Sequence, residues 1–175
     1  MLYQTWASQK IAAGTTIATR IPHFENGRYT VREQVYQVAT LEPHEMVDVY
    51  KKEGIDAKGK LGTLQSNKGK LLHFRKPNHP LFDAAVCTDT ELILLQMTIG
   101  ETHDNNIKTF EEFQAAAQEA KLERMRFIFV VPDRNKFSIA EKVLTDCVVS
   151  DVGGFSSTVE VMELAARNIL SSKTP

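Results

Sequence analysis

The sequence has few features of secreted, membrane-spanning or motif-bearing proteins. Its two cysteines, Cys87 and Cys147, are too few for a disulfide framework and lack metal-ligand spacing, which predicts reduced core thiols. No apolar run approaches the roughly 20 residues of a transmembrane helix. The opening stretch MLYQTWASQKIAAG lacks the apolar segment of a signal peptide. A Gly-rich phosphate loop, a G-x-S-x-G motif and zinc-ligand spacing are also missing from the sequence.

Charge is nearly balanced, with a formal net charge of −1, so no global field directs the chain to nucleic acid or membrane. Its distribution is uneven. Residues 51–76 carry eight lysines and arginines against two acids, whereas residues 101–123 carry six acids against two lysines. This contrast is compatible with phosphate binding on one face. The alternative is a solvated lysine-rich loop.

Length and composition indicate one globular domain over residues 1–175. The chain is 42% hydrophobic and 25% charged, and it is long enough to bury a core. Because it starts at once with helical sequence, we expect a domain excised from a longer modular protein.

Apolar periodicity predicts a mixed α/β fold. Helical spacing favours helices at 2–13, 108–123, 135–146 and 158–172. Alternating or continuous apolar residues favour strands at 14–24, 29–40, 46–50, 70–76, 124–132 and 147–151, and a hairpin at 82–99. Residues 51–69 are expected to form a loop and 153–157 a linker. Asn26-Gly27 predicts a hairpin turn between the first two strands.

The helix at 108–123 connects two strands that we expect to be parallel neighbours, because such crossovers are usually right-handed and return beside the starting strand. The sequence therefore predicts a mixed sheet with helices on both sides.

The hairpin at 82–99 is apolar except for a few polar side chains. Asp83 lies near the start of its first arm, and Gln96 and Thr98 lie late in the second. Mg²⁺ takes oxygen ligands, commonly one or two carboxylates with waters and a substrate phosphate. An Asp on one strand and (D/E)-x-K on the next is typical of restriction-endonuclease-like nucleases. The alternatives are a turn or capping role for Asp83, a structural hydrogen bond for Gln96, and a β-forming role for Thr98.

Several short motifs resemble the C-terminal nuclease-like domain of Crinkler effectors and retrotransposon hot spot (RHS) proteins. They are "HFRKPNHPLFDAAV", "LILLQMTIGETHD" and "FIFVVPDRNKF", together with the opening "LYQTWASQKIAAGTTIATRIP". The matching positions are Asn78, Pro80, Asp83, Gln96, Thr98, His103 and Val130-Val131-Pro132. The resemblance covers most of the chain.

The resemblance implies a restriction-endonuclease-like, PD-(D/E)xK fold with Mg²⁺-dependent DNA cleavage. It also implies action in the nucleus of a host cell or of the parent organism; otherwise the chain is expected to be intracellular. The chain departs from the active pattern at three places. The first helix offers Tyr3, Gln4 and Gln9 where a glutamate is usual, Gln96 replaces the second-strand acid, and Thr98 replaces the lysine.

Two hypotheses follow. In the first, a nuclease-like effector domain binds DNA, with Asp83 and Gln96 holding Mg²⁺ and Thr98 and His103 beside them as catalytic residues. The alternative for His103 is a loop residue without a catalytic role. The residues expected to contact phosphates are Lys68, Lys70, His73, Arg75 and Lys76. In the second, a catalytically inactive nuclease fold binds a host protein. The missing carboxylate and lysine favour the second.

Overall fold

The computed structural model describes most of the chain. The described residues are 2–20, 23–25, 28–30, 36–41, 45–49, 57–74, 82–99, 102–103, 107–133, 138–139 and 149–164. Within these ranges, no helix has the length and apolar character needed to cross a membrane.

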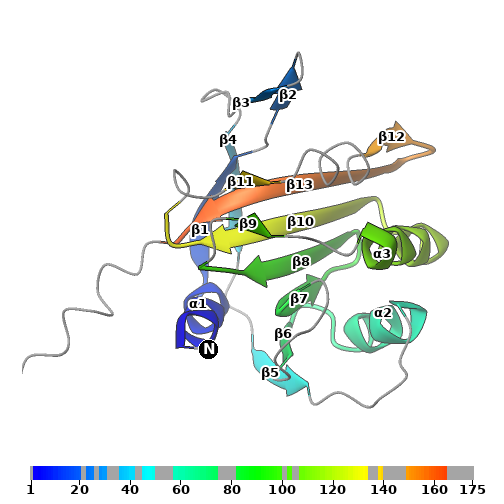
Figure 1. Ribbon diagram of the computed structural model, residues 1–175. Helices are drawn as coiled ribbons and strands as arrows, with labels where there is room; N and C mark the ends of the chain where they lie inside the picture. Colours follow the sequence, from blue (N-terminus) through cyan, green and yellow to red (C-terminus); the bar gives the residue numbers. More distant parts are fainter. Residues whose placement is uncertain are drawn as a thin grey trace, which may run out of the picture.

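A nine-stranded mixed sheet forms the centre of the part that the structure describes, and the predicted α/β class is confirmed (Figure 1). Its order is β4-β1-β13-β10-β8-β7-β6-β5, and β12 pairs with β13. The strands of this sheet are β1 Thr15–Arg20, β4 Tyr36–Leu41, β5 Met46–Val49, β6 Leu71–Phe74, β7 Ala84–Cys87, β8 Glu91–Met97, β10 Arg124–Val131, β12 Val149–Val152 and β13 Phe155–Glu163. Two short pairs lie apart from it: β2 His23–Glu25 with β3 Arg28–Thr30, and β9 Thr102–His103 with β11 Ser138–Ile139.

The strand β10 lies at the middle of the sheet and pairs in parallel with both β8 and β13. After its first residue, every side chain of β10 is buried, as its continuous apolar run predicts. The helix α3, Ile107–Glu119, connects β8 to β10 along the chain. The parallel pairing of these two strands was predicted and is confirmed.

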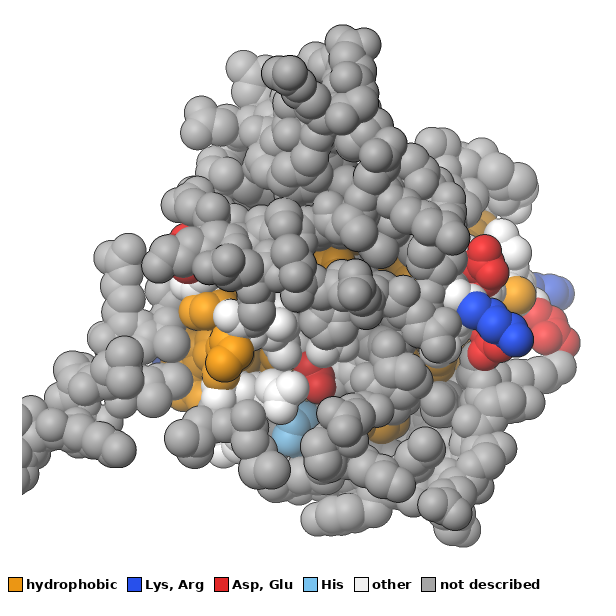
Figure 2. Space-filling view, viewed as in Figure 1, with side chains coloured by type: hydrophobic (Ala, Val, Ile, Leu, Met, Phe, Trp, Pro, Cys, Tyr) orange, Lys and Arg blue, Asp and Glu red, His pale blue; other side chains and the backbone are white. Residues whose placement is uncertain are grey.

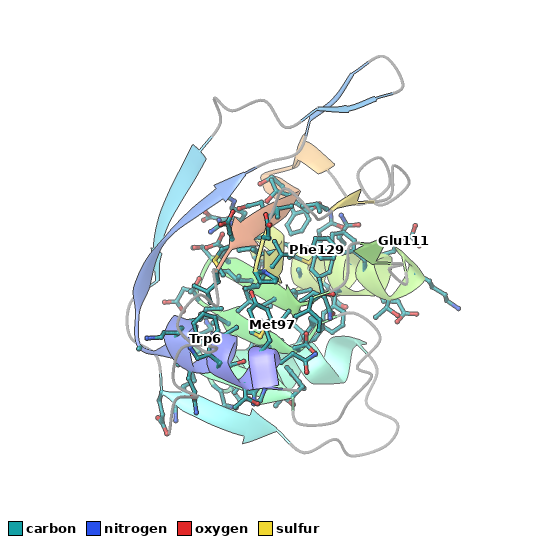
Figure 3. All side chains as sticks on the ribbon, turned by 60° about the vertical axis from the view of Figure 1, so that its left-hand side comes forward. Trp6, Met97, Glu111 and Phe129 are labelled. Atoms are coloured by element: carbon teal, nitrogen blue, oxygen red, sulfur yellow. The ribbon has the colours of Figure 1, made fainter. Side chains whose placement is uncertain are left out.

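Helices cover both faces of the sheet and bury two separate apolar clusters. α2 (Ala57–Gln65) and α3 lie on one face, where Phe82 and Phe113 meet edge to face with ring centroids 5.2 Å apart. α1 (Leu2–Ala12) lies on the other, where its Ala7 and Ile11 pack on apolar residues of β6, β7, β8 and β10. Figure 3 shows Trp6 of α1 beside Met97 of β8, with Glu111 of α3 on the far side.

Several predicted elements are confirmed with close boundaries. α1 ends before Gly14, whose φ of 81° suits a glycine after a helix. β1 and β4 pair antiparallel, as do β2 and β3 around the predicted Asn-Gly turn, and β7 and β8 form the predicted hairpin.

The predicted loop at 51–69 is wrong at Ala57–Gln65, where α2 forms, whereas residues 66–69 form a turn, in agreement with the prediction. Leu61 and Leu64, three residues apart, are buried in the cluster beneath α3. Two glycines and two lysines in this segment favoured a loop, but burial of these leucines stabilises the helix against its weak propensity. Residues 51–56 lie outside the described residues.

The predicted linker at 153–157 and closing helix at 158–172 are also wrong, because β13 runs through Phe155–Glu163. Gly153 and Gly154, with φ of 63° and 84°, form the turn from β12. Ser157 and Val159 are buried beside half-buried Ser156 and Thr158, the period-two pattern of a strand. Residues 165–172 lie outside the described residues.

The predicted helix at 135–146 does not hold at Ser138–Ile139, which form β11 and pair in parallel with β9. The rest of that segment lies outside the described residues. Pairing with β9 provides the two residues with backbone hydrogen-bond partners that a local helix pattern cannot reveal.

Candidate functional site

Asp83 is held in place by its own backbone immediately before β7. Its N–H donates to the carbonyl of Leu95 in β8 at 2.8 Å, and its carbonyl accepts from the N–H of Phe74 in β6 at 2.8 Å. The backbone of Asp83 is therefore fixed between β6 and β8, which also fixes where its half-buried side chain begins.

In the described part of the chain, three N–H donors contact the Asp83 carboxylate. Its Oδ2 accepts from the backbone N–H of Met97 at 2.8 Å and from Nε2 of Gln96 at 2.9 Å. Its Oδ1 accepts from Nε2 of Gln4 at 3.1 Å. The carboxylate thus connects α1 to the end of β8.

Gln96 is 6% exposed, and its side chain is committed to Asp83. Its Oε1 is buried and has no hydrogen-bond partner among the residues that the structure describes. Since the amide is planar, directing Nε2 at Asp83 turns Oε1 away from it. An unpaired buried carbonyl costs about 1–3 kcal/mol, so the contact to Asp83 is made at the expense of Oε1. The hydrogen bond to Asp83 agrees with the alternative interpretation of Gln96, which is a structural hydrogen bond and not a metal ligand.

From the sequence, Gln4 is an amide on the first helix, where active members of the resembled family usually have a glutamate. The structure adds it to the site, with Nε2 also 3.5 Å from the carbonyl of Met97. One turn later, Ser8 donates its hydroxyl to Sδ of Met97 at 3.3 Å. The i, i+4 spacing of Gln4 and Ser8, beside Ala7 and Ile11, placed both on the sheet-facing side of the helix.

Thr98 and His103 lie in different surroundings. The N–H of half-buried Thr98 donates to the carbonyl of Val130 at 3.0 Å, which extends the β8–β10 pairing by one residue. His103 belongs to β9, in the small sheet with β11, and its side chain lies outside what the structure describes.

Of the predicted phosphate-binding residues, the described lysines Lys68 and Lys70 are partly exposed and each pairs with an acid. Lys68 Nζ lies 2.7 Å from Asp89 Oδ1, and Lys70 Nζ lies 2.9 Å from Glu45 Oε2. The hydrogen bond to Asp89 raises the pKa of Lys68. His73 is 5% exposed within β6. Arg75 and Lys76 lie outside the described residues.

Figure 2 shows one face of the molecule, with α3 at its right as in Figure 1. The described basic and acidic side chains at its right lie next to one another.

Mg²⁺ does not fit the contacts around Asp83. The described groups that contact its carboxylate, from Gln4, Gln96 and Met97, are N–H donors, which present positive hydrogen to the position where a cation would bind. Among the described residues, no three His, Cys, Asp or Glu side chains are grouped closely enough to hold a metal.

A second polar cluster lies near the amino ends of the parallel strands. Arg126 forms a bidentate pair with Glu160, Nε to Oε1 at 2.8 Å and Nη2 to Oε2 at 2.6 Å. Thr158 also donates to Glu160 at 2.7 Å. Oε1 of Glu91 lies 3.7 and 3.8 Å from Nε of Arg124 and Arg126. Burial raises the pKa of Glu91, and the two arginines partly offset this.

The comparisons with known proteins add no relative. No family model, curated protein or solved structure matches the chain. What the site does must therefore be inferred from its own contacts.

Proposed function

We propose that this chain is a restriction-endonuclease-like fold that does not cleave nucleic acid and acts as a binding module for a protein partner. The observation that carries the proposal is the contact set of Asp83, whose carboxylate accepts from Gln4, Gln96 and Met97. The order of α1, the β7–β8 hairpin, α3 and β10 supports the fold part of the proposal.

Phosphodiester hydrolysis needs an activated water and a group that stabilises charge on the phosphate. The positions that would supply them carry neutral side chains, Gln4, Gln96 and Thr98. One carboxylate that already accepts three N–H bonds is poorly suited to hold a cation. Asp83 is thus better explained as a structural acceptor than as a catalytic group.

A protein partner is favoured over DNA by the state of the basic residues. Affinity for DNA comes largely from lysines and arginines that release counterions from phosphates. Lys68 and Lys70 already pair with acids, and His73 is buried. The effector role and the nuclear location rest on the resemblance to Crinkler and RHS domains alone.

The test is cleavage of plasmid DNA and short duplexes in Mg²⁺ or Mn²⁺ by the wild type, Asp83→Asn and Asp89→Asn. Asp89 is a matched control, since it is a carboxylate of the same hairpin that pairs with Lys68. We expect no cleavage by any of the three. Cleavage that Asp83→Asn abolishes and Asp89→Asn retains would establish the alternative, a metal-dependent DNA endonuclease.

DNA binding is measured separately, by anisotropy of a labelled duplex over a range of salt concentrations. We expect weak binding at low salt and none at physiological salt. Tight binding that falls steeply with salt would show that the basic segment engages phosphates, and it would refute a protein-only partner. A protein partner captured by proximity labelling should bind with little dependence on salt.

A further inference from the structure

Asp83 joins three parts of the fold that are distant in sequence. We infer that its carboxylate is a latch that fixes α1 to the end of the β7–β8 hairpin, and that this latch occupies the place of a divalent-cation site. The inference goes beyond the proposed function, because it does not depend on which partner the chain binds.

The contacts fix the carboxylate from two directions. On the hairpin side, consecutive residues of β8 donate to the same oxygen, Gln96 through its side chain and Met97 through its backbone. On the helix side, Gln4 donates to the other oxygen. An aspartate can accept at both oxygens at once, whereas an asparagine offers only one acceptor oxygen.

The Asp83 carboxylate contacts the first turn of α1, and this location strengthens the attachment of the helix to the hairpin. Gln4 lies in the first turn of α1, where the helix dipole favours a negative charge. Ala7 and Ile11 bury the following turns against the sheet. A polar contact therefore anchors the beginning of the helix, and apolar contacts anchor the rest.

The orientation of Gln96 makes the latch and a metal site mutually exclusive. A cation beside Asp83 would require Oε1 of Gln96 as a ligand, yet it is Nε2 that faces the carboxylate, at 2.9 Å. Turning the amide over would place Oε1 against a carboxylate oxygen and lose the donor. The amide therefore gives up a partner for Oε1 among the described residues and keeps the hydrogen bond from Nε2 to Asp83.

The first experiment measures the attachment of α1. Amide hydrogen exchange is followed in the wild type, Asp83→Asn and the control Asp89→Asn. We expect Asp83→Asn to lower Tm by about 4–8 °C and to increase exchange at Met97 and in α1. Exchange in the remote α3 should stay as in the wild type, and Asp89→Asn should change neither region. Unchanged exchange at Met97 and in α1 of Asp83→Asn would overturn the latch.

The second experiment uses Mn²⁺ alone as the probe. Bound Mn²⁺ is measured by electron paramagnetic resonance, and Tm is measured with and without about 1 mM Mn²⁺. We expect no bound Mn²⁺ and no change in Tm for the wild type. Binding that raises the Tm of the wild type and is lost in Asp83→Asn would show a metal site and overturn the inference. Since this readout needs no DNA and no partner, it can fail while the proposed function stands.

Gln96→Glu completes the set by replacing the donor with a second carboxylate. Without metal, we expect this variant to have a lower Tm than the wild type, because like charges then face each other at Asp83. A Tm equal to that of the wild type would show that donation by Gln96 does not matter and would contradict the latch.

Discussion

The ion pair between Arg126 of β10 and Glu160 of β13 allows a direct test of the region that the sequence misassigned. The two residues are 3% and 0% exposed and share two hydrogen bonds. In Glu160→Gln, the guanidinium stays charged and buried but loses its bidentate carboxylate partner, and Oε1 of Glu91 remains 3.8 Å from its Nε. Breaking one side of such a buried pair costs about 3–5 kcal/mol. This is a large share of the roughly 5–15 kcal/mol by which domains are stable.

The assay is urea unfolding at 25 °C, followed by circular dichroism and tryptophan fluorescence. With a slope of about 2 kcal/mol per M, the midpoint should fall by about 1.5–2.5 M with an unchanged slope. The matched control is Asp89→Asn, which breaks the exposed pair with Lys68 and should leave the midpoint within error. The double variant Arg126→Met/Glu160→Leu should recover most of the loss, because apolar pairs of similar size often replace buried ion pairs without cost.

A midpoint that Glu160→Gln lowers no more than Asp89→Asn does would refute a buried pair between Glu160 and Arg126. Glu160 would then not face Arg126 from a neighbouring strand, and residues 155–163 could be helical after all. A double variant that is less stable than Glu160→Gln would show that an apolar pair cannot replace the ion pair. The charges themselves would then stabilise the packing of β10 on β13.

Three further outcomes are expected. Burial raises the pKa of Glu91 above its ordinary value of 4.5, so the carboxyl proton is bound more tightly in the folded state than in the unfolded state. The contribution of Glu91 to stability therefore falls as the pH rises above the unfolded-state pKa. The Tm of Glu91→Gln relative to the wild type should therefore increase between about pH 4 and pH 7. Gly62→Ala in α2 should raise the free energy of unfolding by about 0.5–1 kcal/mol, since no atom lies within 4 Å of the added Cβ, whereas Gly69→Ala, at a φ of 74°, should lower it. Lys121→Gly should stabilise the end of α3 by about 1 kcal/mol in urea unfolding, because Lys121 has a φ of 58°.

Elements with a strong local pattern could be predicted from the sequence, and those that depend on distant contacts could not. The strand β10 has an unbroken apolar run, and α3 has a clear apolar face, so both were predicted with close boundaries. α2 has two apolar anchors, Leu61 and Leu64, among glycines and lysines, and its burial under α3 is a tertiary effect. β13 contains Val-Glu-Val-Met-Glu, which suits a helix or a strand until the pairing with β10 is known.

The contacts around Asp83 also could be predicted only where they are local in sequence. The hairpin predicted that Asp83 and Gln96 would lie close together, and their side chains are in contact at 2.9 Å. Gln4 could not be assigned, because it is distant in sequence and its role depends on where α1 packs. The pairing of Arg126 with Glu160 was missed for a similar reason, since Glu160 was expected on a helix.

Two side chains near Asp83, those of Gln4 and Gln96, bear on whether its carboxylate has a structural or a catalytic role. A catalytic carboxylate needs neighbours that supply lone pairs for a cation, whereas a structural one needs neighbours that supply N–H groups. Gln4 and Gln96 have the same shape as glutamate but present Nε2 donors to Asp83. An exchange of one nitrogen for oxygen at each position would reverse the polarity of the site without changing the backbone that positions it. The proposed structural role of Asp83 therefore depends on the amide side chains of Gln4 and Gln96.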